Sequence, residues 1–587
     1  MKGKLSKSAL WLIILVLIIT FAATMANLIE RDFGNVKVSI IKIINDQGQT
    51  VVAKLFRPVT ATAENPAPAI LNMHGYQNDK NVQDSISIEL AKRGFVVLAP
   101  DSLGHGDSGA AGLDLMGWFA NPAYVMGNET ATTYLITLPF VDAAKIGVTG
   151  HSMGGMNAVK LPALFPDNVK AVVQQASSPA NVPNILMLQA RFDEFVGFRE
   201  NQLLTNDLPT SETRLAALGL TETANWDTTY GSFADGTARR MAWIQMDHHF
   251  LSLTNKAVAE TVDWFNEALR NGNGGPTWTD PTKQTFMLKE IFGFVTLLGA
   301  MLTMLPLTSL LLKTPFFAPV AQPLPKRYVA KKNYWWLAAT INMLIGGILY
   351  PLTTQYGGIL TKIETWFPWM KMEMANGVAA FFLVNAVVCF VLFLLWFRGA
   401  KKKQDVTMYD MGVSFDEEKT KIDWKIIGKT VLVGVILFAF MYILEGFFQW
   451  ALGQEFRFVW PFMRQFSSAN RVGYFAMYFI PSLLFWLVNG GIFLFGQIHQ
   501  KEYSTPAKTQ WMWWLKAVYA MVTGLFLVLC LQYVPWLAGA GPGFELLGLP
   551  QFTSMWPLML LVYIPQFIIF FWFLVWFYRK TGRIYLG

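Results

Sequence analysis

A glycine-bounded turn at residues 150–155 is the clearest candidate for chemistry in this sequence. It reads Gly-His-Ser-Met-Gly-Gly and matches Gly-x-Ser-x-Gly, the sharp strand-to-helix turn that exposes a nucleophilic serine. Residues 146–149 favour a strand before it, and residues 156–164 favour a helix after it, although Pro162 would kink or shorten that helix. The alternative is an ordinary tight turn, but the context on both sides indicates that Ser152 is a nucleophile.

A serine hydroxyl is a weak nucleophile at neutral pH, so it needs a base. In chains with this turn, the base is a histidine that follows both the serine and the acid. His248 and His249 come shortly after a predicted strand at residues 240–245. We interpret His248 as the base because it holds the earlier position after the strand, and His249 remains the alternative.

The acid that orients this base should follow the preceding strand, which is predicted at residues 184–189. Asp193 and Glu194 both lie shortly after it. We interpret Asp193 as the acid, which would hold the imidazole in the right tautomer and stabilise the imidazolium. Glu194 remains the alternative, and it would otherwise be a surface or helix-capping residue.

Backbone amides should stabilise the oxyanion that forms when the serine attacks a carbonyl. One amide is expected from Met153, the residue after the nucleophile. The loop after a predicted strand at residues 69–73 reads His-Gly-Tyr-Gln, and its glycine lets the backbone fold close to a substrate. We therefore assign the second amide to Tyr76, and we expect His74 to be a structural hydrogen-bonding residue.

Residues 32–273 must form the elements that position these side chains. Strands are predicted at residues 36–44, 50–57, 69–73, 95–99, 145–149, 169–174, 184–189 and 240–245, and helices at residues 82–93, 152–164 and 253–270. The alternation predicts an α/β fold with a mostly parallel sheet and helices on both faces. In such sheets the functional residues lie in loops beyond the carboxyl ends of the strands.

A second glycine pattern, at residues 104–109, competes with this interpretation. It matches Gly-x-Gly-x-x-Gly, the dinucleotide-binding pattern, which requires a helix directly after it and an acidic residue about 20 residues further on. Residues 110–118 contain two more glycines, and no acidic residue ends a strand at that distance. We therefore predict a glycine-rich loop and no cofactor. No His-Glu-x-x-His motif indicates a metal, and Cys389 and Cys530 lie in apolar runs that suggest no disulfide framework.

Together, these motifs resemble the alpha/beta-hydrolase superfamily, specifically its dienelactone-hydrolase-like and peptidase-like esterase branches. The resemblance rests on residues 74–75, 100–108, 150–155, 193–196 and 247–250. It covers less than half of the chain, and the C-terminal half resembles no family that we recognise. The resemblance implies Ser152 as nucleophile, Asp193 as acid and His248 as base. Residues 189–191 read Gln-Ala-Arg where many relatives have a glycine turn, which leaves Glu194 open as the acid.

The composition of the whole chain differs from that of a soluble enzyme. Of its 587 residues, 53% are hydrophobic and 15% are charged, and the mean hydropathy is +0.34. Soluble domains carry about 25% charged residues. The apolar excess lies in eight segments of bilayer-spanning length, predicted at residues 10–25, 291–312, 334–354, 376–397, 426–446, 473–497, 513–536 and 555–578. We expect a signal-anchor helix in residues 1–31, an α/β domain in 32–273 and an all-α membrane domain in 274–587.

The distribution of lysine and arginine predicts the topology. Positive clusters follow alternate spans, and the positive-inside rule then places both termini in the cytoplasm. The α/β domain falls outside the cytoplasm, and we expect a bacterial cell membrane. The net charge of +8 is a topology signal on this interpretation, so no nucleic-acid partner is needed. Glu445, near the outer end of the fifth span, is either a functional carboxylate or one that reaches the interface.

These expectations combine into one functional hypothesis and one alternative. We predict a membrane-bound serine hydrolase that cleaves an ester, thioester or amide of an amphiphilic or lipid-like substrate, with membrane lipids as its surroundings. The alternative is a transporter or lipid-handling protein whose outer domain processes or gates the cargo, although the spans lack the paired charges or clearly broken helices of many ion-coupled transporters. Residues 199–237 form either a lid over the site or an ordinary connection. The oligomeric state is not predicted.

Overall fold

The computed structural model divides the chain into two compact units. It describes residues 5–113, 115–200, 202, 204–325, 332–354, 359–417, 421–461, 463–466, 469–496, 502–548 and 555–586. We call Ile14–Met301 together with Leu444–Arg464 the sheet unit, and the remainder of the chain the helical unit. Each unit is described by itself below.

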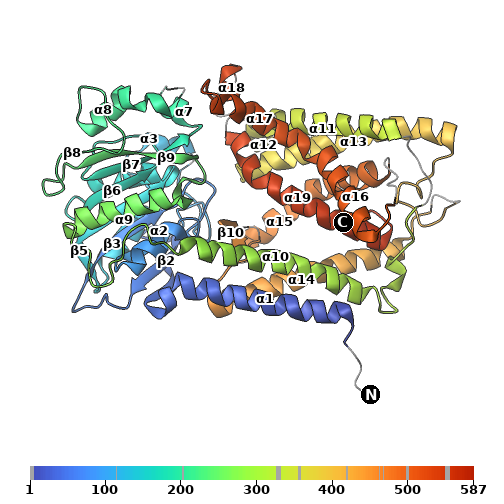
Figure 1. The fold of residues 1–587 in the computed structure, drawn as a ribbon, viewed down its shortest axis with the longest axis horizontal. Coiled ribbons are helices and arrows are strands. Elements are labelled where there is room, and N and C mark those ends of the chain that lie inside the picture. Colours follow the sequence, from blue (N-terminus) through green and yellow to red (C-terminus); the bar gives the residue numbers. More distant parts are fainter. Residues whose placement is uncertain are drawn as a thin grey trace. The chain divides into compact units, whose positions relative to one another are not determined.

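The sheet unit is built on nine strands in the order β1-β2-β4-β3-β5-β6-β7-β9-β8 (Figure 1). They are β1 (Val36–Ile44), β2 (Thr50–Pro58), β3 (Ala67–Met73), β4 (Val96–Pro100), β5 (Val141–His151), β6 (Val169–Gln175), β7 (Ile185–Phe192), β8 (Thr229–Tyr230) and β9 (Arg239–Asp247). Strands β4, β3, β5, β6, β7 and β9 run parallel, while β1, β2 and β8 pair antiparallel. The predicted mostly parallel sheet is confirmed.

Helices cover both faces of this sheet, which explains the near-continuous apolar character of its central strands. On one face α2 (Asp84–Lys92) and α9 (Asn255–Arg270) pack over a core that includes Ile70 and Phe265. The close approach requires Gly147, since a Cβ there would lie 2.5 Å from the Phe265 ring. The other face carries α4 (Asn128–Ile136), α5 (Met153–Ala158), α6 (Leu161–Leu164) and α8 (Glu212–Leu218).

The helix predicted at residues 152–164 is divided in two. The first part, α5, ends at Ala158, and α6 begins at Leu161 with Pro162 in its first turn. Proline lacks an amide hydrogen and its ring clashes with the preceding turn, so it is tolerated at a helix start but not in a helix interior. The break therefore has the cause that the sequence suggested.

The connection at residues 199–237 packs into the core of the domain where the structure describes it. Leu208, Ala217 and Ala224 are buried in the same cluster as the sheet residues. The Thr205 hydroxyl donates a 2.6 Å hydrogen bond to the Arg191 carbonyl at the end of β7. These contacts favour an integral connection over a detached lid.

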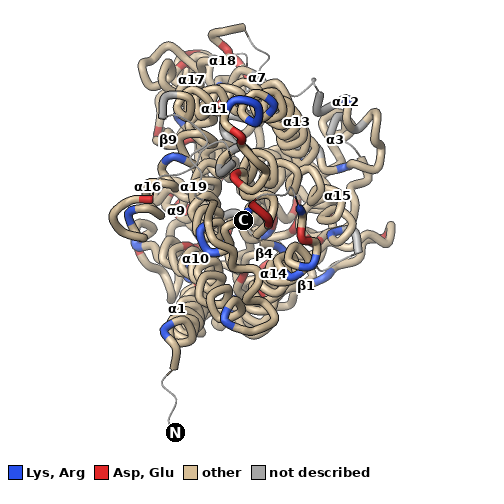
Figure 2. Tube along the Cα trace, turned by 90° about the vertical axis from the view of Figure 1, so that its right-hand side faces the viewer, with Lys and Arg blue, Asp and Glu red and all other residues tan. Residues whose placement is uncertain are grey.

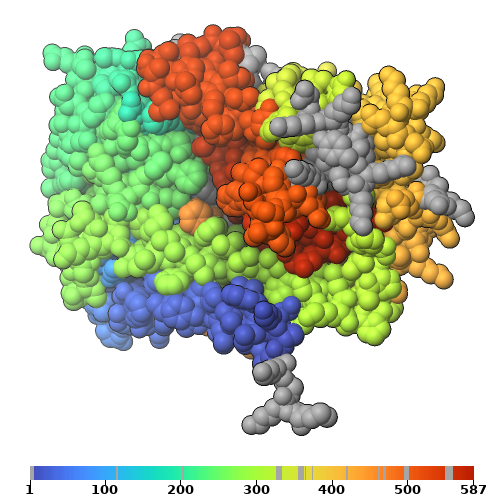
Figure 3. All heavy atoms as spheres, turned by 45° about the vertical axis from the view of Figure 1, so that its right-hand side comes forward, coloured from blue at the N-terminus to red at the C-terminus, as the bar shows by residue number. Residues whose placement is uncertain are grey.

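Three long helices contribute residues to the sheet unit. They are α1 (Lys7–Glu30), α10 (Phe286–Leu311) and α14 (Trp424–Leu452), and α14 is followed by a tight hairpin of β10 (Arg457–Phe458) and β11 (Trp460–Pro461). Helices α1 and α10 lie side by side (Figure 3), with the Phe21 and Phe292 rings 6.1 Å apart and Ile19 against Gly299. The carboxylate of Glu445, in α14, is buried.

The helical unit contains the remaining long helices of the described chain. They are α11 (Lys332–Thr354), α13 (Glu373–Gln404), α15 (Ala469–Phe485), a π-helix η5 (Trp486–Gly496), α16 (Pro506–Met521), α17 (Thr523–Leu537) and α19 (Met555–Thr581), with short helices α12 (Ile359–Trp366) and α18 (Gly543–Leu546). Among all described helices, seven are long and apolar enough to cross a membrane, and charged residues are sparse along them (Figure 2). The chain thus has helices compatible with an integral membrane protein.

The seventh predicted span, at residues 513–536, is a broken helix rather than a continuous one. Helices α16 and α17 bend by 53° relative to each other at Val522. The expectation that the spans lack clearly broken helices is therefore wrong at this position. Helix α11 packs closely beside the break, because a Cβ on Gly524 would lie 1.9 Å from the Met343 carbonyl oxygen.

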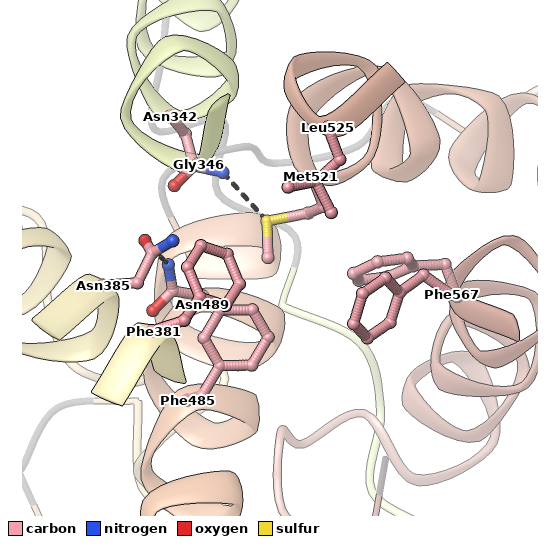
Figure 4. Close-up of a pocket in the computed structure, with 10 residues that line it drawn as sticks. Asn342, Gly346, Phe381, Asn385, Phe485, Asn489, Met521, Leu525 and Phe567 are labelled. Carbon is pink, nitrogen blue, oxygen red and sulfur yellow. Dashed lines mark hydrogen bonds between the residues drawn. The ribbon is translucent and has the colours of Figure 1, made fainter. Parts of the chain in front are cut away.

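A small polar pocket lies beside this break, within the helical unit (Figure 4). The Asn489 amide, from the π-helix, donates to Asn385 at 2.8 Å, and the Asn342 amide donates to the Met521 sulfur at 2.9 Å. Phenylalanine rings complete the wall, including Phe381, Phe485 and Phe567. Asparagine side chains are costly in an apolar bundle unless they are hydrogen-bonded, and Asn342, Asn385 and Asn489 all take part in hydrogen bonds.

Candidate active site

Ser152 lies at a strained turn between β5 and α5. Its φ of 53° and ψ of −113° are unfavourable for a residue with a side chain, and such strain is found mainly at functional sites. The turn needs glycine on both sides. A Cβ on Gly150 would lie 2.3 Å from the Gly154 carbonyl, and one on Gly154 would lie 2.5 Å from the Met73 carbonyl oxygen. The Gly-x-Ser-x-Gly pattern is thus required by backbone contacts.

The loops after β5, β7 and β9 meet at the carboxyl edge of the sheet. His248 Nδ1 lies 2.9 Å from Asp193 Oδ1, and both side chains are buried. His151, the neighbour of Ser152, bonds the His248 carbonyl oxygen through Nε2 at 2.7 Å, and the two rings are 4.8 Å apart. These contacts bring the three predicted triad positions into one small region.

No hydrogen bond joins the Ser152 hydroxyl to the His248 imidazole among the described residues. In unliganded enzymes such catalytic hydrogen bonds are often long and tighten only when substrate binds. The hydrogen bond between His248 and Asp193 nevertheless directs Nε2 of His248, the atom that must take the serine proton, away from the carboxylate.

Asp193 accepts hydrogen bonds from four donors. Oδ1 accepts from His248 Nδ1 and from the Phe195 amide at 3.1 Å, and Oδ2 accepts from Gln189 Nε2 at 2.7 Å and from the Arg199 guanidinium. Burial alone would raise the pKa of Asp193, but Arg199 and His248 hold that pKa well below its usual range. The carboxylate therefore stays ionised beside the imidazole.

The two alternative residues occupy different environments. The backbone amide of His249 donates to Asp247 Oδ1 at 2.8 Å, and burial lowers the pKa of the His249 ring well below its usual value. Glu194 is buried next to Asp193 in the chain. His248 and Asp193 are the histidine and carboxylate that bond each other, as a catalytic base and its orienting acid would.

The loop after β3 approaches the turn that carries Ser152. A Cβ on Gly75 would lie 2.8 Å from His151 Nδ1, so only glycine fits there. His74 is a structural residue in this structure, since Nδ1 bonds the Gly75 carbonyl at 2.7 Å and Nε2 accepts from the Ser102 amide at 3.0 Å. Burial lowers the pKa of His74 to about 4, so the ring is neutral at physiological pH.

The two residues predicted to supply oxyanion amides belong to one apolar cluster. Met153 is buried with Trp118 and Met126, and Tyr76 packs against them together with Met156. The Trp118 indole is fixed by a 2.8 Å hydrogen bond to the Asn157 side chain in α5. This buried apolar cluster adjoins Ser152.

The glycine-rich loop at residues 104–109 surrounds a carboxylate of the chain itself. Asp101 Oδ2 accepts the Asp107 amide at 2.8 Å, and a Cβ on Gly106 would lie 2.1 Å from the Asp101 carboxyl carbon. The next helix, α3 (Leu115–Ala120), begins six residues after Gly109. A phosphate would compete with Asp101 for the same amides, which disfavours the dinucleotide interpretation.

Several functional neighbours escaped sequence reasoning. Gln189 and Arg199 both bind Asp193, and His151 binds the loop that carries His248. Gln189 stands where relatives carry a glycine turn, and that departure was the one available signal. Within the described residues, no group of three His, Cys, Asp or Glu side chains could hold a metal ion.

One known family matches part of the sheet unit. Residues 68–238 match the family described as alpha/beta hydrolase fold. An uncharacterized protein of Mycobacterium tuberculosis is 32% identical over 106 residues, which are 18% of this chain and 28% of that protein. The chain thus spans under a third of that relative's length.

The chain is also similar to solved structures at low identity. A Pyrococcus furiosus esterase is 12% identical with a TM-score of 0.29, over 41% of this chain and 96% of that chain. A dienelactone hydrolase-like promiscuous phosphotriesterase from metagenomic libraries is 15% identical with a TM-score of 0.28, over 37% of this chain and 85% of that chain.

Proposed function

We propose that this chain, whose sheet unit carries an alpha/beta-hydrolase domain, is a membrane-bound serine hydrolase of the esterase type. The observation that carries the proposal is the convergence at one sheet edge of a strained serine turn and a buried pair of His248 and Asp193, 2.9 Å apart. A histidine paired with an ionised carboxylate is the partner that a serine needs to become a nucleophile.

The proposed mechanism is a two-step acyl transfer. The Ser152 oxygen bonds the substrate carbonyl carbon while His248 Nε2 takes the hydroxyl proton. The amides of Met153 and Tyr76 stabilise the oxyanion, and loss of one such donor typically costs about 100–1000-fold in rate. His248 then gives the proton to the leaving alcohol, thiol or amine, and water releases the acyl group by the same steps.

The substrate class is an amphiphilic or lipid-like ester, thioester or amide. Support comes from the buried apolar cluster of Trp118, Met126 and Met153 next to the nucleophile. The apolar helices of the same chain would keep the enzyme at a lipid surface, where such substrates concentrate.

The topology with the hydrolase domain outside the cytoplasm is tested with single introduced cysteines. Asn273 and Lys402 are both exposed, and they lie on opposite sides of the membrane in the proposed topology. We expect an impermeant maleimide to label Asn273→Cys in intact cells and Lys402→Cys only after permeabilisation. The reverse pattern would contradict the proposed orientation.

The serine mechanism is tested with a fluorophosphonate probe on membranes that contain the full chain. We expect Ser152→Ala and His248→Ala to lose labelling, and His249→Ala and the control Ser232→Ala to keep it. Labelling that persists in Ser152→Ala would refute the nucleophile assignment. Labelling that is lost in His249→Ala and kept in His248→Ala would make His249 the base instead of His248.

A transporter or lipid-handling role remains a second candidate because of the helical unit. A helix broken by 53° and a π-helix flank the asparagine pocket, and broken helices with inward polar groups line many transport sites. The test is transfer of a fluorescent phospholipid across proteoliposomes, with Asn489→Leu as the variant. Transfer no faster than in empty liposomes would remove this candidate.

A further inference from the structure

Two arginines from the far end of the sequence enter the catalytic side of the sheet unit. They belong to the polar segment after α14, which is part of this unit. Arg457 lies 3.4 Å from Asp79 Oδ1, and Arg464 forms an ion pair with Asp79 Oδ2. The Asp79 side chain is fully buried, and Arg457 is 3% exposed. The Asp79–Arg457 pair is therefore shielded from water, whereas Arg464 is 28% exposed and reaches the buried carboxylate from the surface.

Asp79 belongs to the same loop as the proposed oxyanion donor. It lies three residues after Tyr76, and its Oδ1 also accepts the Asn81 amide at 2.9 Å. The next residue, Lys80, bonds the Asp101 and Asp107 carboxylates at 2.7 Å each. The distal end of the oxyanion loop is thus held by ion pairs on two sides.

The hairpin that carries Arg457 is itself held firmly. Val459 has a φ of 57° at the hairpin turn, and its amide donates to Glu290 Oε2 of α10 at 2.8 Å. Gly293 of α10 allows this approach, because a Cβ there would lie 2.8 Å from the Arg457 carbonyl oxygen. Glu455 adds a 3.2 Å hydrogen bond from the Asn81 side chain. Arg457 therefore reaches Asp79 from a rigid support.

The neighbouring positive charges keep the Asp79 carboxylate ionised. Burial alone would raise the pKa of Asp79, but Arg464, Arg457 and Lys80 hold that pKa well below its usual range. Without Arg464 the buried Asp79 carboxylate keeps only Arg457 and Lys80 as positive neighbours, and the weaker compensation favours a shift of Asp79 toward them or toward water. Any such movement of Asp79 pulls on the backbone three residues from Tyr76.

We propose that Arg457 and Arg464 are positioning residues for the oxyanion loop, so that the turnover of the hydrolase depends on the polar segment after the candidate span α14. The inference rests on the proposed serine-hydrolase function. An oxyanion donor acts only when its amide lies within about 2.7–3.1 Å of the developing charge. A displacement of about 1 Å can cost about 100-fold in rate. The arginines would thus act on the transition state without touching the substrate.

The test compares Arg464→Gln with Arg464→Lys in the purified full-length protein in detergent, with a p-nitrophenyl ester as substrate. We expect Arg464→Gln to lower kcat about 10–100-fold while KM changes less than about threefold, because the oxyanion forms only after binding. Arg464→Lys should recover part of kcat, since it restores the charge.

Arg93→Gln is the matched control. Arg93 forms a buried ion pair with Glu89 at 2.6 Å in the same unit, and its bonds run to α2 and to residues 279–283 instead of the oxyanion loop. We expect this variant to lower the unfolding temperature while kcat stays within about twofold of wild type. If Arg464→Gln keeps a wild-type kcat, or if Arg93→Gln lowers kcat equally, the arginines are only structural and the inference is wrong.

Fluorophosphonate labelling separates this failure from failure of the proposed function. Wild-type protein whose labelling does not depend on Ser152 would refute the function, and the inference with it. Wild-type protein that labels at Ser152, with Arg464→Gln labelling at the same rate, would refute the inference alone. If Arg464→Gln does not fold, kcat and KM of Arg464→Lys are measured instead. A lower kcat with a similar KM would support the inference, and a wild-type kcat would count against it.

Discussion

Replacing Asp193 with asparagine should disable the enzyme for a reason visible in the structure. The carboxylate receives four donors on two oxygens, and an amide has only one oxygen. In one orientation the amide NH2 faces Arg199 and Gln189, and in the other it faces His248 and the Phe195 amide. Each orientation places donors against donors, so the substitution cannot keep all four hydrogen bonds.

The charge on Arg199 decides between these orientations. A hydrogen bond from a charged donor is about twice as strong as one between neutral groups, so the amide oxygen should turn toward Arg199. The NH2 group then faces His248 Nδ1, which must become an acceptor and carry its proton on Nε2. That tautomer cannot take the serine proton, and such a change typically costs about 10⁴-fold in kcat, or about 5 kcal/mol of activation free energy.

The assay measures p-nitrophenyl ester hydrolysis and fluorophosphonate labelling of purified Asp193→Asn, with Glu194→Gln as the matched control. The double variant Asp193→Asn with Arg199→Met should regain at least about tenfold, because the amide oxygen is then free to face His248. A loss of less than about tenfold in Asp193→Asn would refute the reasoning. Loss confined to Glu194→Gln would make Glu194 the acid instead.

Three further predictions concern the same region. Gly154→Ala should reduce labelling more than about 100-fold and lower the unfolding temperature, because its Cβ would lie 2.5 Å from the Met73 carbonyl oxygen; wild-type values would contradict this contact. Burial lowers the pKa values of His74 and His105 to about 4, so the unfolded chain binds more protons than the folded one below pH 6.5. The unfolding temperature should therefore fall as pH drops from 6.5 to 4, and a flat profile would count against neutral buried rings. Trp118→Ala should lower kcat/KM for long-chain esters more than for acetyl esters, and equal losses would show that the apolar cluster does not bind the acyl chain.

The order of elements in the hydrolase domain could be predicted because its signals are local. The short apolar strands between glycine and helix-forming stretches specify a parallel sheet with little help from distant residues. Pro162 marks the break between α5 and α6 for the same reason. The bend at Val522, beside the close contact of α11 with Gly524, could not be predicted from the apolar run that contains it. The mean hydropathy of a segment shows how long and how apolar it is, but it does not show whether the helix bends.

The sequence by itself determined the chemistry that is available: a serine in a turn that only glycines allow, two candidate histidines, two candidate acids and eight apolar segments. Only the tertiary structure decided which of them meet. It pairs His248 with Asp193, encloses Asp193 with Gln189 and Arg199, and brings Arg464 to Asp79 across 385 positions of sequence. The physical reason is that ion pairs and hydrogen bonds form only over a few ångströms. The separation of two residues in the sequence determines their distance in space only when both lie in the same turn or strand.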